Sequence, residues 1–98
     1  MSIAHSWQKV GQHRITEADL ILNVQKKTVK RFKIIQGPHG RYTIVVTLTW
    51  REEELTLMTA RKTVKEWASL DRLVRHIQEH YGDVPTIWLI LNTRESSE

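Results

Sequence analysis

Cysteine is absent from this chain of 98 residues. The absence excludes a disulfide framework and a zinc site built on thiolates. Long apolar runs are also missing: the longest lie at 44–48 and 87–91, whereas a membrane-spanning helix needs about 20 residues. The start of the chain lacks the charged leader and apolar segment of a secretory signal. We therefore expect a cytoplasmic protein with no membrane segment.

The sequence contains no internal repeat and no linker rich in proline, glycine or serine. With 98 residues, of which 40% are hydrophobic, the chain is long enough for one domain with one core. Residues 1–15 show no sustained periodicity and residues 93–98 are polar, so both segments are expected to be flexible. The predicted organisation is a single domain, 1–98.

Alternating apolar residues predict strands at 29–36, 41–51 and 54–61. The glycine and proline cluster at 37–40 is typical of a hairpin connection. Five residues of the second strand are expected to face the core: Tyr42, Ile44, Val46, Leu48 and Trp50. The last strand, 86–92, is apolar enough to predict a place inside the sheet rather than at its edge.

One helix is predicted over 70–81. Ser69 is a suitable N-cap, and Leu70, Leu73, Ile77 and Tyr81 recur at helical spacing. The segment 18–25 is ambiguous. Thr16 and Asp19 favour a helix cap, but Leu20, Leu22 and Val24 also alternate as in a strand, and we favour the strand.

These elements predict an α+β fold. We expect a mostly antiparallel sheet in the order β-β-β-α-β, with 18–25 as an additional N-terminal strand, and one amphipathic helix packed on one face.

The sequence HIQEH at 76–80 matches H-x-x-E-H, the signature of inverted zinc proteases. Such a site needs a third protein ligand and an enclosed cleft. Only 18 residues follow His80, and at 100° per residue His76 and Glu79 lie outside the apolar stripe of the helix. We expect the motif to face water, as two solvated histidines that bind a metal ion weakly at most. The sequence predicts no metal site, no cofactor, no catalytic residue and no enzymatic activity.

Positive charge is concentrated in the first half of the chain. Residues 1–50 contain 8 basic and 2 acidic side chains, whereas residues 51–98 contain 7 and 9. The basic group is Lys26, Lys27, Lys30, Arg31 and Lys33. This asymmetry points to a polyanionic partner, namely nucleic acid. The alternative is a set of solvated lysines that guard a sheet edge.

A second basic group precedes the predicted helix and consists of Arg61, Lys62 and Lys65. Cations beside a capped helix start favour a phosphate. The adjacent Trp67 suits stacking on an unpaired base, although a hydrophobic lid on the core is the alternative. We expect the two basic groups to lie on one continuous surface.

The tryptophans, at 7, 50, 67 and 88, are numerous for this length. Because the last strand has apolar residues on both faces and only one helix is predicted, one surface of the sheet needs a cover. The N-terminal segment with Trp7, or a second copy of the chain, would supply it.

The segment LMTARKTVKEWASLDRLVRHI, residues 57–77, predicts a strand, a basic loop and a helix start. It resembles a unit in short uncharacterised accessory proteins of bacterial plasmids and integrative elements. The resemblance implies an accessory protein of a mobile element and assigns no functional residue.

Taken together, these patterns predict a small non-enzymatic accessory domain that binds nucleic acid mainly through phosphate contacts. The alternative is a protein-interaction or homodimerising module.

Overall fold

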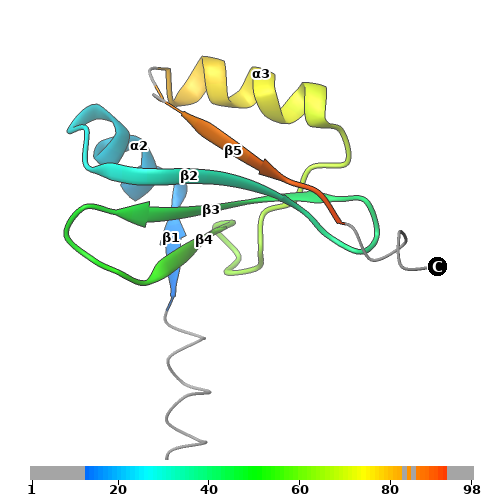
Figure 1. Ribbon diagram of the computed structural model, residues 1–98, viewed down its shortest axis with the longest axis horizontal. Helices are drawn as coiled ribbons and strands as arrows, with labels where there is room; N and C mark the ends of the chain where they lie inside the picture. The colour runs from blue at the N-terminus through cyan, green and yellow to red at the C-terminus, as the bar shows by residue number, and fades with distance from the viewer. Residues whose placement is uncertain (1–12, 83, 85, 93–98) are drawn as a thin grey trace, which may run out of the picture.

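The computed structural model describes residues 13–82, 84 and 86–92. Its elements, shown in Figure 1, are β1 (Arg14–Thr16), α2 (Glu17–Gln25), β2 (Val29–Gln36), β3 (Tyr42–Leu48), β4 (Glu54–Met58), α3 (Leu70–His80) and β5 (Ile87–Ile90). Arg14 and Ile15, which we expected to be flexible, belong to β1, while the flexible ends expected at 1–12 and 93–98 lie outside the described residues. Neither of these helices combines the length and the hydropathy of a membrane-spanning helix.

The five strands form one sheet in the order β1-β4-β3-β2-β5. The central strands β2, β3 and β4 are antiparallel, but β1 is parallel to β4 and β5 is parallel to β2. Four strands therefore run in one direction and only β3 runs in the other. The expectation of a mostly antiparallel sheet was wrong at both edges, because α2 links β1 to β2 and α3 links β4 to β5 as helical crossovers between parallel strands.

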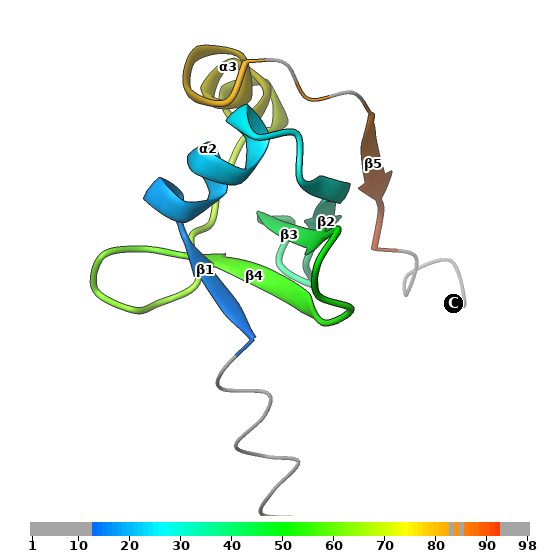
Figure 2. The same ribbon diagram turned by 90° about the vertical axis from the view of Figure 1, so that its left-hand side faces the viewer.

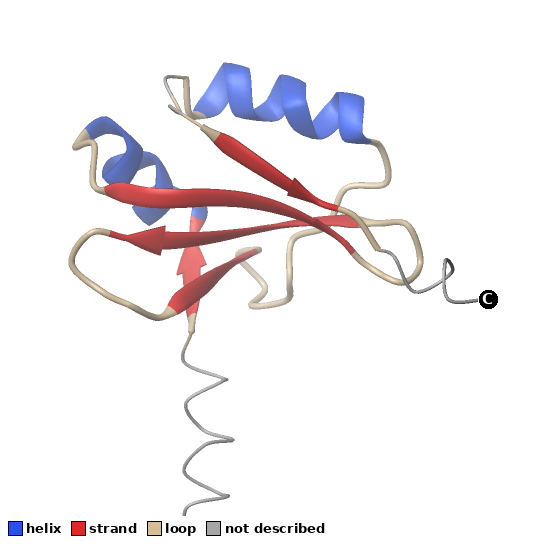
Figure 3. Cartoon of the chain, viewed as in Figure 1, coloured by secondary structure: helices blue, strands red, loops and turns tan. Residues whose placement is uncertain are grey.

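The segment that we expected to be an extra strand forms helix α2 (Figure 3). Thr16 is the N-cap, and its Oγ1 accepts a hydrogen bond from the backbone N–H of Asp19 at 3.2 Å. Leu20 and Val24, four residues apart, are buried, whereas Leu22 is exposed. The alternation of Leu20, Leu22 and Val24 was therefore misleading. The face of α2 that contacts the core is identified by the helical spacing of Leu20 and Val24.

Helix α3 confirms its prediction. Ser69 caps it by accepting a hydrogen bond from the N–H of Arg72, and Leu73, Ile77 and Tyr81 are buried. Tyr81 is the C-cap, and the chain leaves the helix through Gly82 at φ +70°.

Both helices cover the same face of the sheet (Figure 2). One core cluster joins them to the three central strands through Leu20, Val24, Phe32, Ile34, Ile44, Val46, Leu48, Leu55, Leu57, Leu73, Ile77 and Tyr81, with Ile15 from β1. Ile44, Val46 and Leu48 face this core as predicted. Trp50 does not: its exposed fraction is 63%, because β3 ends at Leu48 and the chain then turns.

Candidate functional site

Strand β5 forms one edge of the sheet and pairs only with β2 among the described strands (Figure 2). Its four residues and Leu91 have exposed fractions between 38% and 55%. The segment 86–92, TIWLILN, contains no charged residue. Our prediction that this strand lies inside the sheet was wrong, since a continuous apolar run is also compatible with an exposed edge.

The register shows which face each residue of β5 occupies. Ile87 and Leu89 pair with Phe32 and Ile34 and therefore point to the side of the helices. Trp88 pairs with Lys33 and so points to the open face, as does Ile90, which pairs with Ile35. Both faces of this edge strand are thus apolar and accessible to solvent.

The end of β5 is fastened to the β2–β3 hairpin. The backbone N–H of Asn92 donates to Gln36 Oε1 at 3.1 Å, and Asn92 Nδ2 donates to the carbonyl of Gly37 at 3.3 Å. These bonds hold the strand in place beside β2, so the exposed apolar residues are presented by an ordered strand.

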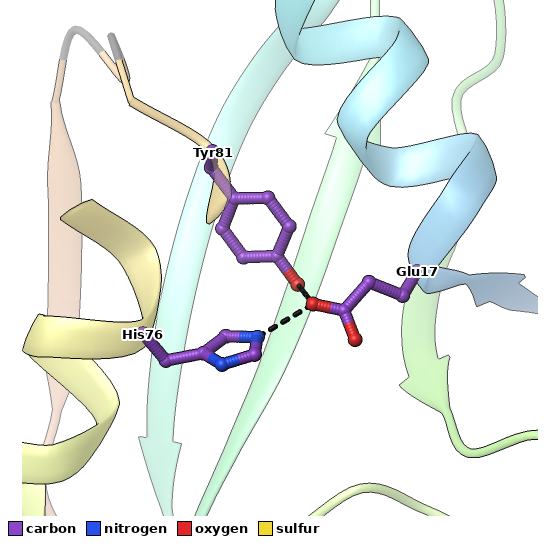
Figure 4. A network of polar contacts seen from close by, with 3 residues as sticks. All are labelled: Glu17, His76 and Tyr81. Carbon is purple, nitrogen blue, oxygen red and sulfur yellow. Dashed lines mark hydrogen bonds and ion pairs between the residues drawn. The ribbon is translucent and has the colours of Figure 1, made fainter. Parts of the chain in front are cut away.

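A second feature is a polar network between the two helices, formed by Glu17, His76 and Tyr81 (Figure 4). Glu17 is the first residue of α2, and its Oε2 lies 2.5 Å from His76 Nε2. The same oxygen accepts a hydrogen bond of 3.0 Å from the Tyr81 hydroxyl. His76 is half-buried, so the expectation that it faces water was wrong, whereas Glu79 and His80 are exposed as predicted.

The network alters the acidity of its members. Burial by itself would raise the pKa of Glu17, but the hydrogen bonds from His76 and Tyr81 and the positive charge of Lys65 outweigh it, so this pKa is lowered. Burial, together with the Glu17 carboxylate, raises the pKa of Tyr81 well above its usual value. Since His76 Nε2 and the Tyr81 hydroxyl both contact one carboxylate oxygen, the network joins α2 to α3.

Within the described residues, no three side chains among histidine, aspartate and glutamate are grouped so that they could hold a metal ion. The rings of His76 and His80 have centroids 4.2 Å apart, but Glu79 of the motif points elsewhere and is exposed. That the protein holds no stoichiometric zinc and has no enzymatic activity are statements that stay predictions.

The first basic group surrounds the start of β2. Lys26 and Lys27 follow α2, and Lys30 and Arg31 lie near the first residue of β2. All four are exposed, and none has an ion pair with a described residue. Lys33 differs, because its ammonium group forms an ion pair with Glu54 of β4.

In the second basic group, Arg61 and Lys62 lie beyond the opposite end of the sheet, whereas the backbone N–H of Lys65 donates to the carbonyl of Leu57 in β4 at 3.0 Å. Arg61 and Lys62 occupy a tight turn after β4, with Lys62 at φ +68°. Trp67 is half-buried against the core, and its backbone pairs with Tyr42 at the start of β3 through bonds of 2.8 and 2.9 Å. Lys65 Nζ lies 5.4 Å from the centroid of the Trp67 ring. Trp67 therefore packs as a hydrophobic lid on the core, which was the alternative to base stacking.

The expected continuous surface does not form. The start of β2 pairs with the end of β3 and not with its beginning, because Val29 is opposite Leu48. At about 3.3 Å per residue, the length of β3 places Arg61 and Lys62 roughly 20 Å from the start of β2. Because β2 and β4 are both antiparallel to β3, they run in the same direction, and the start of β2 and the end of β4 therefore lie at opposite ends of the sheet.

No family model matches the chain, and no curated protein or solved structure is significantly similar to it. The resemblance to accessory proteins of mobile elements therefore stays a prediction. Trp7, which we considered as a cover for the sheet, lies outside the described residues.

Proposed function

We propose that this domain is a protein-interaction module that self-associates by pairing β5 with β5 of a second copy. The observation that supports the proposal is the exposure of apolar residues on both faces of an uncharged edge strand. Fully burying an exposed Leu or Ile side chain contributes about 1.5–3 kcal/mol, and each half-exposed side chain of β5 would contribute a part of this. Strand pairing would bury such surface and also satisfy the outward backbone N–H and C=O groups of the edge.

A second copy of this chain suits the strand geometrically. A two-fold axis perpendicular to the sheet makes the two β5 strands antiparallel and leaves the helices of both copies on the same side. Ile87 and Leu89 of the two copies then continue the helix-covered layer, while Trp88 and Ile90 continue the open face. Because 86–92 contains no charge, the pairing brings no like charges together.

Sedimentation at increasing protein concentration tests this function. The unaltered chain should shift from monomer to dimer, whereas Ile90→Lys should stay monomeric because a lysine at the edge opposes strand pairing. Val74→Lys is the matched control: Val74 lies on α3 and is exposed to 40%, against 41% for Ile90. A chain that is monomeric at every concentration, or an Ile90→Lys variant that dimerises like its parent, would contradict the proposal.

Nucleic-acid binding is a second candidate function, favoured by the four exposed cations around the start of β2, Lys26, Lys27, Lys30 and Arg31, which have no acidic partner in the described part of the chain. Cations of this kind attract phosphates and release counterions on binding. Arg61 and Lys62 of the second basic group, at the other end of the sheet, provide an internal comparison.

The test uses two double variants that remove the same charges. Lys30→Gln with Arg31→Gln should weaken binding of oligonucleotides and reduce its salt slope by about 0.7 per lost phosphate contact for a single strand. Arg61→Gln with Lys62→Gln should have little effect, because these residues lie at the far end. Equal losses in both variants would contradict an interface at the start of β2, and no binding by the parent between about 50 and 200 mM salt would rule out this function.

A further inference from the structure

A groove lies beside the first basic group, between α2 and the connection from β3 to β4. Its volume is about 490 Å³, and its wall includes Arg14, Leu22, Lys26, Trp50 and Arg51. Core residues of β1, β3 and β4 form its floor. The groove thus combines an exposed tryptophan with cations from three separate segments.

Hydrogen bonds hold the Trp50 ring in position. Trp50 Nε1 donates to Asn23 Oδ1 at 3.2 Å, and the same oxygen accepts a bond of 2.6 Å from the Thr28 hydroxyl. Asn23 Nδ2 in turn donates to the carbonyl of Asp19 at 2.8 Å within α2. Although 63% of Trp50 is exposed, its polar edge is fixed by the helix, so the face of the ring is oriented before any ligand binds.

The charge around the ring is mainly positive. Arg14, Lys26 and Arg51 line the groove against a single carboxylate, that of Asp19. The Arg51 guanidinium lies 6.0 Å from the centroid of the Trp50 ring and also bonds to Glu53 at 3.3 Å. An aromatic face bordered by cations recognises a ligand that is planar at one end and anionic at the other.

We infer that this groove binds an unpaired nucleobase through Trp50 and its phosphate through Lys26 and Arg14. The inference rests on the second candidate function and gives it a site, with Trp50 in the stacking role that the sequence had suggested for Trp67. A base inside a duplex has no free face to offer, so the ligand is single-stranded nucleic acid or a free nucleotide. Lys30 and Arg31 are further exposed cations at the start of β2, at the same end of the sheet as Trp50, and favour a strand.

Fluorescence anisotropy with a labelled single-stranded oligothymidylate of about 12 nucleotides tests the inference. Trp50→Ala should weaken binding about 5- to 150-fold, the equivalent of one lost stacking contact. Trp50→Phe should retain most of the affinity. Trp88→Ala is the control, since Trp88 is similarly exposed, at 54%, but lies on β5. Circular dichroism establishes that each variant is folded.

Thymidine monophosphate and a duplex of the same length complete the experiment. If the protein binds the single strand but neither the duplex nor the monophosphate, the site is supported and its ligand is the strand. If an equal concentration of monophosphate displaces the labelled strand, the site is supported and its ligand is a nucleotide. If Trp50→Ala binds like its parent while Lys30→Gln with Arg31→Gln weakens binding, the groove is refuted and the second candidate function stands. If neither strand nor nucleotide binds the parent, both are refuted.

Discussion

The two edges of the sheet differ in how they meet solvent. At one edge β1 is three residues long, presents Arg14 and Thr16 outward and buries only Ile15. At the other edge β5 presents apolar residues on both faces and no charge. Short length and charge are the usual means by which a protein prevents an edge from pairing with another chain. The edge at β1 has both, whereas the edge at β5, which is four residues long, is short but carries no charge.

The edges also differ in their attachment to the helices. β1 runs directly into α2, whose first residue, Glu17, is bonded to His76 and Tyr81 of α3 and its cap. β5 is attached mainly to β2 and by Asn92 to the β2–β3 hairpin. The β1 edge is therefore part of the monomer's core, whereas the β5 edge has surface left to bury.

The largest expected difference between the edges is the effect of replacing an isoleucine by alanine. Ile15→Ala should lower the free energy of unfolding by about 2–5 kcal/mol, because Ile15 is 6% exposed and its removal leaves a cavity. Ile87→Ala should lower it by about 1 kcal/mol or less in the monomer, because Ile87 is 38% exposed. Denaturant unfolding at low protein concentration measures both. Equal losses would show that β5 is as much a part of the monomer core as β1.

A smaller effect is expected at the network beside β1. Glu17→Gln should lower the free energy of unfolding at neutral pH by about 1–2 kcal/mol, because it removes charged hydrogen bonds to His76 and Tyr81. Glu79→Gln, an exposed site on α3, is the matched control and should change little. The same loss in both variants would show that the network does not stabilise the fold.

The pH dependence of this contribution follows from the lowered pKa of Glu17. Because the carboxyl is more acidic in the folded than in the unfolded chain, its contribution is present above its ordinary pKa of 4.5 and is lost as pH falls through the folded value. The difference between the parent and Glu17→Gln, measured by unfolding at a series of pH values, should shrink over that range. A difference that is constant down to the folded pKa and below would contradict the assignment.

The smallest expected effect is that of a charge on β5. Ile90→Lys should change the monomer's free energy of unfolding by about 0.5 kcal/mol or less, because the side chain is 41% exposed on the open face. Thermal unfolding at low concentration checks this value. A large loss of free energy of unfolding would mean that Ile90 is needed for folding. The effect of Ile90→Lys on dimerisation could then be a result of unfolding.

Local patterns predicted the centre of the molecule. The alternation around Ile44 and Val46 and the stripe of Leu73 and Ile77 identified β3 and α3, because each pattern extends over a whole element. In the eight residues 18–25 the two periodicities overlap, and only the cap at Thr16 favoured the helix. Because the sequence did not predict α2, it also did not predict the helical crossover from β1 to β2, which leaves β1 parallel to β4.

The candidate sites depend on contacts that no local pattern contains. Glu17 and His76 are 59 residues apart, and Trp50 and Asn23 are 27 apart. The exposure of Trp50 depends on where β3 ends, and the edge position of β5 depends on strand order. Sequence supplied the apolar character of β5 but could not show which strand would lie beside it.

Cysteine scanning of β5 tests the central claim most directly, since the chain has no cysteine of its own. In a two-fold antiparallel pair, opposite residues point to the same face, so one residue must lie directly opposite its own copy. Single cysteines introduced at each of 87–91 should therefore yield one position that a short thiol-to-thiol cross-linker joins efficiently into a dimer, with its neighbours less reactive. Val74→Cys on α3 should not be cross-linked, because Val74 lies away from the paired strands. Cross-linking no better at any position of β5 than at Val74→Cys would contradict the pairing of β5 with β5.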